Sequence, residues 1–223
     1  MLISHKHKFI TIEIPKTGSR SLRESLIPLH ILVDGRKTLK LGLQQHSSAN
    51  QTRLTFKEVH MVAHGGFIPV WGEYFKYTVV RNPWQRYFSF FKYYKNICES
   101  YLRQDASIEW NACSIDQGKQ CVELFENKDN QSVLKCIMSM HPSQDTYYCD
   151  GKGHVLMDHI AEFENLQKEF AHLCDRVGVV TPNLVHSNKS ISSLDMQDIY
   201  NQELIDLVAD REKHVIQLKG YDY

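Results

Sequence analysis

The stretch that decides the fold is Phe9-Ile-Thr-Ile-Glu-Ile14, followed directly by Pro15-Lys-Thr-Gly-Ser-Arg-Ser21. The first part is rich in β-branched residues, and its isoleucines recur at every second position, which predicts a strand. Proline and glycine then break the strand, and Leu22 and Leu26 lie four residues apart, as on one face of a helix. The sequence therefore predicts a strand, a glycine-containing turn and a helix in succession.

A second passage from strand to helix lies further along the chain. The strand Tyr74-Phe-Lys-Tyr-Thr-Val-Val80 ends at Arg81, and Asn82-Pro83 then opens a helix that we expect to run to about Arg103. Asparagine is a good N-cap, and proline suits the first helical position. Aromatic residues follow one face of this helix, and the other face is predicted to be polar, with Asn82, Gln85, Arg86, Ser89 and Lys92.

The rest of the chain continues the alternation of strands and helices. Residues 104–150 are polar, acidic and irregular, apart from a short helix expected around 122–138, and we interpret them as a region inserted over one end of the sheet. A helix from Leu166 to Val177 and a last helix over 199–215 follow. This order predicts an α/β fold with a mainly parallel central sheet and helices on both faces.

Length and composition indicate one soluble domain. The chain has 223 residues, of which 42% are hydrophobic and 23% charged, so disorder and fibrous folds are excluded and we expect a single domain over 1–223. No run approaches the roughly 18 apolar residues of a membrane span, and Met1 is followed by no signal-peptide core. The expected location is therefore cytoplasmic, or the Golgi lumen if the natural protein is longer.

Charge is polarised along the chain although the formal sum is zero. Residues 1–103 carry 16 basic and 6 acidic side chains, whereas 104–223 carry 10 and 20. A basic half suits an anionic ligand, and the alternative is that the two halves neutralise each other in the fold. The basic residues are dispersed, which disfavours a nucleic-acid partner.

Six cysteines show neither a CxxC pair nor zinc-like spacing, so metal binding by cysteine is not expected. Free thiols are the expected state in a reducing compartment. A disulfide among the five cysteines between 98 and 149 remains the alternative for a secreted, longer protein.

The turn after the first strand has the features of an anion site. A turn that leads into a helix N-terminus presents N–H groups with a partial positive charge, and Gly18 allows close approach of the backbone. Thr17, Ser19 and Ser21 add hydroxyl groups, and Lys16 adds a charge that can follow developing negative charge. The alternative is an ordinary turn with a solvated lysine. The Walker pattern is absent because Lys16 precedes the glycine.

A second candidate anion site lies after the second strand. Arg81 stands at the strand end and can bind a phosphate with two hydrogen bonds, and Ser89 lies two turns into the following helix. In parallel sheets, ligands bind beyond the carboxyl ends of strands, where both turns lie. Together the two sites indicate a ligand with two separated phosphates. Read alone, Arg81 could form a structural ion pair and Ser89 could be an exposed helix serine.

The pair of motifs resembles a known family. Pro15-Lys-Thr-Gly-Ser-Arg-Ser-Leu22 together with Val80-Arg-Asn-Pro-Trp-Gln-Arg-Tyr-Phe-Ser-Phe-Phe91 is similar to the sulfotransferases that use 3′-phosphoadenosine-5′-phosphosulfate (PAPS), and more closely to their carbohydrate branch. Asp158–Leu166 and Asn188-Lys-Ser190 follow in the order expected of that branch. The resemblance implies a P-loop-like sulfotransferase architecture, PAPS as sulfate donor and PAP as product, with no metal.

The resemblance also implies roles for individual residues. Lys16 would contact the bridging oxygen and the 5′-phosphosulfate, and Arg81 and Ser89 would hold the 3′-phosphate. The remaining loop residues would hold the 5′-phosphate, namely Thr17, Gly18, Ser19, Arg20 and Ser21. Arg20 stands where many relatives carry threonine, so a backbone N–H would serve there instead.

A catalytic base is required because the attacking hydroxyl must lose its proton. His60 and His64 lie some twenty residues before Arg81, where similar glycan sulfotransferases place a histidine, and His60 matches that position better. Glu13 and Glu58 are outside candidates. The two histidines have the spacing of helical zinc ligands, but no HExxH glutamate or third ligand accompanies them, so no metal is expected.

These features predict in-line transfer of a sulfuryl group from PAPS to a hydroxyl, most naturally of a saccharide. One alternative is a nucleotide-dependent phosphotransferase, although a Walker lysine and a magnesium-holding carboxylate are not found. Another is a non-catalytic module that binds nucleotides or sulfated glycans through its basic half. The sequence leaves the acceptor and the oligomeric state open.

Overall fold

The computed structural model describes residues 1–223 apart from 5, 27–47, 52–59, 64–65, 106–111 and 185–193. The chain forms two compact units, one from 1–81 with 143–187 and the other from 82–142 with 188–223. In the described part, the first unit holds the strands and the second is helical.

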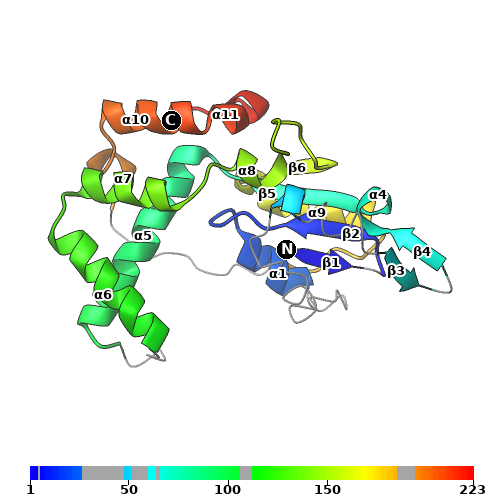
Figure 1. The fold of residues 1–223 in the computed structure, drawn as a ribbon, viewed down its shortest axis with the longest axis horizontal. Helices are drawn as coiled ribbons and strands as arrows, with labels where there is room; N and C mark the ends of the chain where they lie inside the picture. The colour runs from blue at the N-terminus through cyan, green and yellow to red at the C-terminus, as the bar shows by residue number, and fades with distance from the viewer. Residues whose placement is uncertain (5, 27–47, 52–59, 64–65, 106–111, 185–193) are drawn as a thin grey trace. The chain divides into compact units, whose positions relative to one another are not determined.

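The first unit is built on a four-stranded sheet with the order β1-β2-β5-β6 (Figure 1). Its strands are β1 (Leu2–Ser4), β2 (Phe9–Ile12), β5 (Phe75–Val80) and β6 (His159–Glu162). β5 pairs in parallel with both β2 and β6, whereas β1 runs antiparallel to β2. The predicted α/β fold with a mainly parallel sheet is confirmed, and the short edge strand β1 was not predicted.

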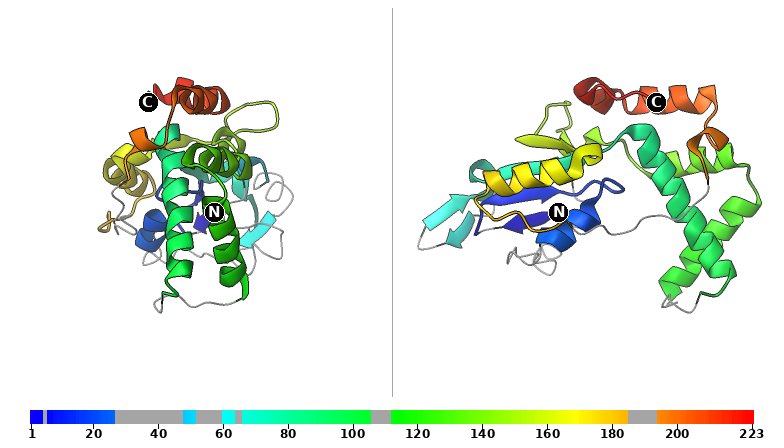
Figure 2. Two further views of the ribbon diagram at one scale, coloured as in Figure 1. Left: turned by 90° about the vertical axis from the view of Figure 1, so that its left-hand side faces the viewer. Right: turned by 180° about the vertical axis from the view of Figure 1, so that it is seen from behind.

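Two helices, α1 (Ser19–Leu26) and α9 (Leu166–Arg176), contribute to the core of the first unit. Their apolar residues join one core cluster with strand residues that share a face of the sheet, and Figure 2 shows α9 running along the sheet. The cluster includes Phe9, Tyr77, Val79 and Ala161 from the strands and Leu22, Leu26, Phe170 and Leu173 from the helices. Ile10, Ile12 and Val80 alternate with the strand residues and are at most 2% exposed, so both faces of the sheet are buried.

Smaller elements complete the first unit. Strands β3 (His60–Ala63) and β4 (Gly66–Pro69) form a separate antiparallel pair, and α4 (Val70–Glu73) follows them. A short helix α8 (Asp145–Tyr148) precedes β6, and one turn of 3₁₀-helix, η2 (Phe163–Asn165), joins β6 to α9.

The second unit begins with α5 (Pro83–Leu102), which matches the predicted helix. The Asn82 side chain accepts a hydrogen bond from the N–H of Gln85 at 3.2 Å, as expected of an N-cap, and Pro83 takes the first helical position. Helix α6 (Ala112–Glu126) packs along α5 (Figure 2), and α7 (Asn130–Met140) follows it.

The expectation of an irregular region over 104–150 is wrong for most of that stretch. The stretch forms two helices, α6 and α7, instead of one short helix around 122–138. A turn separates them, and Asp129 in that turn caps α7. The Asp129 carboxylate accepts the N–H of Ser132 at 2.8 Å, and such a cap starts a new helix within a polar sequence.

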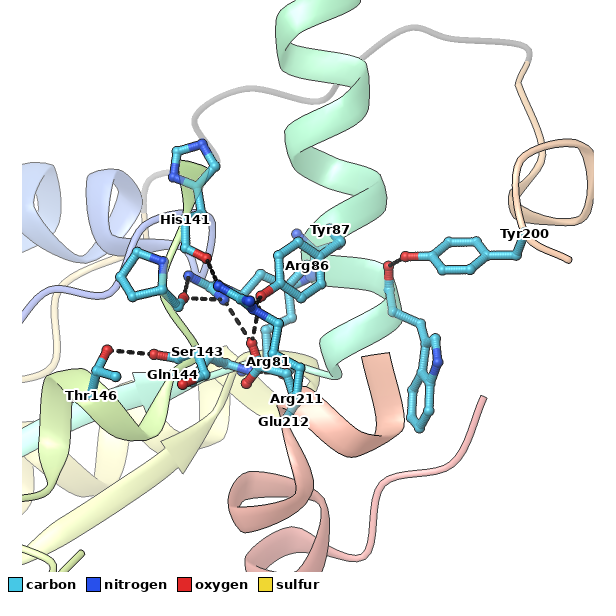
Figure 3. Close-up of polar contacts among 12 residues, drawn as sticks. Arg81, Arg86, Tyr87, His141, Ser143, Gln144, Thr146, Tyr200, Arg211 and Glu212 are labelled. Carbon is cyan, nitrogen blue, oxygen red and sulfur yellow. Dashed lines mark hydrogen bonds and ion pairs between the residues drawn. The ribbon is translucent and has the colours of Figure 1, made fainter. Parts of the chain in front are cut away.

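The predicted last helix is also divided, into α10 (Gln202–Arg211) and α11 (Lys213–Lys219), after the short turn η3 (Met196–Asp198). Glu212 stands between α10 and α11 and is fully buried. Its carboxylate forms an ion pair with Arg86 at 3.0 Å and accepts the Tyr87 hydroxyl at 3.0 Å (Figure 3). Burial, and then the Glu212 charge, raise the pKa of Tyr87 to about 12.

This pairing corrects the expectation that Arg86 lies on a polar helix face. Arg86 is 0% exposed, and its guanidinium also donates to the carbonyl oxygen of Pro142 at 3.3 Å. A buried charge is tolerated because it is paired and hydrogen-bonded. Within the second unit, this ion pair therefore joins α5 to the residue between α10 and α11, far apart in the sequence.

Where their side chains are described, the cysteines are free thiols, namely Cys98, Cys121, Cys136, Cys149 and Cys174. Burial raises the pKa of both Cys121 and Cys149 to about 11, so these thiols stay protonated at neutral pH. Across the described ranges, no helix combines the length and the apolar character that a membrane span requires.

Candidate active site

The loop between β2 and α1 has an unusual backbone conformation. Lys16 has φ 68° and Gly18 has φ 78°, so both lie in the left-handed region on either side of Thr17. Leu22 donates its N–H to the carbonyl oxygen of Gly18 at 3.1 Å, which is the first hydrogen bond of α1. The first N–H groups of a helix lie outside its own hydrogen-bond ladder, and with the helix dipole they favour an anion at this end.

The left-handed conformation of Lys16 is a strained feature of this loop. A non-glycine residue with such a φ costs about 1–3 kcal/mol, and strain of this kind is concentrated at functional sites. Gly18 meets a second constraint, because a Cβ atom there would lie 2.9 Å from the side chains of both Phe163 and Leu166. The loop is therefore held against the connection between β6 and α9.

The Gly18→Ala substitution tests this packing. We expect it to lower the free energy of unfolding by about 1–3 kcal/mol and to weaken binding of PAP, the ligand that the sequence predicts, since the loop must move away from Phe163. Gly153 is the matched control, because it has φ 83° but no atom within 4 Å of an added Cβ. Urea unfolding and PAP titration compare the two variants. Equal losses of stability, with PAP affinity unchanged in Gly18→Ala, would contradict this account of the loop.

The predicted loop residues differ in the burial of their side chains and in what those side chains bind. Thr17 is fully buried, and its hydroxyl donates to the carbonyl oxygen of Ile14 at 2.9 Å. The hydroxyl proton is therefore used in a hydrogen bond within the chain. Arg20 is exposed, and its Nε donates to Glu24 at 2.9 Å along the helix surface. Ser19 is half-buried and Ser21 is buried in the first turn of α1. For Thr17 and Arg20, the backbone N–H is therefore the group suited to an anion.

Arg81 lies beside this loop, as expected from the pairing of β2 with β5. The two strands are parallel neighbours, so their carboxyl ends meet at one edge of the sheet. The Arg81 Nη1 atom donates to the carbonyl oxygen of Lys16 at 3.2 Å, and its guanidinium lies 4.3 Å from the centre of the Phe163 ring. The structure thus brings the Arg81 guanidinium into contact with the backbone of Lys16 within the first unit.

The other predicted residues are placed differently. Ser89 is half-buried on α5, which belongs to the second unit, whereas Arg81 belongs to the first. His60 begins β3, where its backbone pairs with Pro69, and the structure does not describe its side chain. His64 lies outside the described residues.

Of the two outside candidates for the base, Glu13 lies within the described residues. Glu58 also lies outside the described residues. Glu13 is 2% exposed and accepts a hydrogen bond at 3.0 Å from Nε of Arg23 on α1. Its carboxylate is therefore a structural anchor of α1 rather than a suitable base.

Two further residues contact Arg81, and this role was not predicted for either of them. Phe163 follows the carboxyl end of β6, and the rule that sites form at such ends could have identified it. Gln144 binds the Arg81 backbone from a stretch without periodicity, about sixty residues further along the chain, and no local pattern indicates it. Within the described ranges, no three side chains of histidine, cysteine, aspartate or glutamate are grouped as metal ligands would be.

A glycine-containing loop leads into a helix and is joined to an arginine at the end of the neighbouring parallel strand, an α/β arrangement that suits an anion of the phosphate type. The model of the sulfotransferase family matches residues 1–215. The chain therefore belongs to the sulfotransferase family, and its activity is of the sulfuryl-transfer class with a hydroxyl-bearing acceptor. No curated protein and no solved structure is significantly similar to it.

Proposed function

We propose that this chain transfers a sulfuryl group from PAPS to a hydroxyl of a saccharide. The observation that carries the proposal is the contact of Arg81 with the Lys16 carbonyl, which joins the two anion-binding elements at one edge of the sheet. A donor with a 5′-phosphosulfate and a 3′-phosphate carries negative charge at two separate positions, and two joined cationic elements suit such a molecule.

The loop would bind the 5′ end of the donor. Backbone N–H groups of the loop and of the first turn of α1 provide fixed dipoles, and Gly18 keeps the backbone open to close approach. Lys16 would neutralise the charge left on the 5′-phosphate as its bond to sulfur breaks. Because the backbone of Lys16 is held in the left-handed conformation and bound by Arg81, the direction in which its side chain leaves the backbone is set before the donor arrives.

Arg81 would bind the 3′-phosphate, and Ser89 is proposed as its partner from the resemblance alone. The reaction forms a bond between the acceptor oxygen and sulfur while the bond between sulfur and the phosphate oxygen breaks. The acceptor proton passes to His60, and the electron pair of the broken bond stays on PAP. Positioning and electrostatic stabilisation suffice for such a transfer.

The role of the base is tested by replacing each histidine alone. We expect His60→Ala to lower kcat about 10²- to 10⁴-fold, because proton transfer to a positioned base contributes that much. PAP affinity should stay unchanged, and His64→Ala is expected to retain most of the activity. Steady-state rates measure kcat, and PAP titration measures PAP affinity, for both variants. Full activity in His60→Ala with loss in His64→Ala would reassign the base to His64.

The acceptor is proposed to be neutral rather than a heavily anionic polymer. Residues 104–150 carry eight acidic and three basic side chains, which would repel a polysulfated chain. Incubation with radiolabelled PAPS and a panel of neutral sugars, heparan-like chains and small hydroxyl compounds tests both acceptor and reaction. Label in neutral sugars supports the proposal, and preferential label in heparan-like chains contradicts the acceptor class.

A further inference from the structure

Gln144 holds both backbone polar groups of Arg81. The N–H of Arg81 donates to Oε1 of Gln144 at 2.9 Å, and Nε2 of Gln144 donates to the Arg81 carbonyl oxygen at 2.8 Å. Gln144 is 0% exposed. A buried amide needs partners for its donor and its acceptor, and this one finds both on a single residue.

This clamp lies at the point where the sheet ends. Val80 is the last residue of β5 that pairs with β6, opposite Glu162, and Arg81 is the first residue beyond it. A peptide group of a neighbouring strand would offer the same donor and acceptor. The Gln144 side chain therefore fixes the backbone of Arg81 beyond the end of β5.

The Arg81 side chain is fixed at its other end by the loop between β2 and α1. Its guanidinium donates to the Lys16 carbonyl oxygen at 3.2 Å and lies over the Phe163 ring. Phe163 in turn lies against Gly18. Since the ring and the carbonyl are fixed, the direction of the Arg81 backbone decides whether its guanidinium meets both of them.

We propose that Gln144 is the positioning residue that sets Arg81 for recognition of the 3′-phosphate and thereby lets the chain distinguish PAP from nucleotides that lack this phosphate. The inference rests on the proposed function, because it takes Arg81 as the 3′-phosphate ligand. Gln144 acts through Arg81 and not on the reacting atoms.

At this position the neutral amide supplies the donor and the acceptor together. Methionine has a similar size and offers neither hydrogen bond. Ionised glutamate can accept the Arg81 N–H, but it presents a second acceptor to the Arg81 carbonyl oxygen in place of a donor. Both substitutions therefore remove the hydrogen bond to the Arg81 carbonyl oxygen, and only methionine also removes the hydrogen bond from the Arg81 N–H.

The test compares the affinities of PAP and of 5′-AMP, which lacks the 3′-phosphate, by calorimetry. In wild type we expect PAP to bind more tightly than 5′-AMP. In Gln144→Met and in Gln144→Glu, the ratio of the two affinities is expected to fall about tenfold or more, with 5′-AMP affinity unchanged. Arg81→Met should lower the ratio further, and adding Gln144→Met to it should cause no additional fall.

Thr146→Ala is the control, since Thr146 is exposed and donates to the Ser143 carbonyl oxygen at 2.6 Å within the same turn. It should leave the ratio unchanged. A purely structural role for Gln144 would lower both affinities equally and preserve the ratio in both variants, which overturns the inference alone. Wild type that binds PAP no more tightly than 5′-AMP overturns both this inference and the proposed function.

Discussion

Lys16→Ala is expected to lower the rate of sulfuryl transfer about 10²- to 10³-fold, the effect of removing one group that stabilises developing charge. PAP affinity should fall less, because the loop N–H groups and Arg81 remain in place. The Lys16 backbone is held through its carbonyl oxygen by Arg81. The substitution therefore removes the ammonium group while the loop keeps this contact, and single-turnover rates with PAPS separate chemistry from binding.

Lys8→Ala is the matched control for this substitution. Lys8 is an exposed lysine of the same unit and has φ 52°. Alanine at this position therefore takes the same left-handed backbone conformation, but outside the proposed anion site. Its transfer rate should equal that of wild type. Normal turnover in Lys16→Ala, or an equal loss in both variants, would remove Lys16 from the mechanism.

The largest effect on stability is expected for Glu212→Ala. The substitution leaves the fully buried Arg86 without its carboxylate partner, which we expect to lower the free energy of unfolding by about 3–5 kcal/mol. The double variant Arg86→Met with Glu212→Leu removes both charges and should be clearly more stable than Glu212→Ala. Urea unfolding followed by circular dichroism measures all three proteins.

Glu203→Ala is the control for Glu212→Ala, since Glu203 lies on the adjoining helix α10 and pairs with Lys135 at the surface. That pair joins side chains that are 67% and 41% exposed, so its loss should change stability by less than about 1 kcal/mol. Similar losses in the free energy of unfolding from Glu203→Ala and Glu212→Ala would show that burial of the pair between Arg86 and Glu212 adds nothing to stability.

The parts of the fold predicted correctly are those fixed by local sequence. Isoleucines at alternate positions predicted β2, and the Asn82-Pro83 pair predicted the start of α5, because capping depends on adjacent residues. The division at Glu212 could not be predicted in this way. Glu212 at this division pairs with Arg86, 126 residues earlier, and no local pattern reports such a contact.

The same distinction between local motifs and distant contacts applies to the candidate site. Lys16, Gly18 and Arg81 follow strands and belong to short motifs, so they could be proposed from sequence alone, and the structure places Arg81 on the backbone of Lys16. The role of the Thr17 hydroxyl could not be predicted, since it depends on the fold of the loop. Gln144 reaches Arg81 through tertiary packing alone.

The most direct test of the account is a crystal structure of the chain grown with PAP. The proposed function predicts the 5′-phosphate within hydrogen-bond distance of the loop from Lys16 to Ser21 and the 3′-phosphate on the Arg81 guanidinium. Density for PAP elsewhere on the chain, or a 3′-phosphate turned away from Arg81, would contradict it.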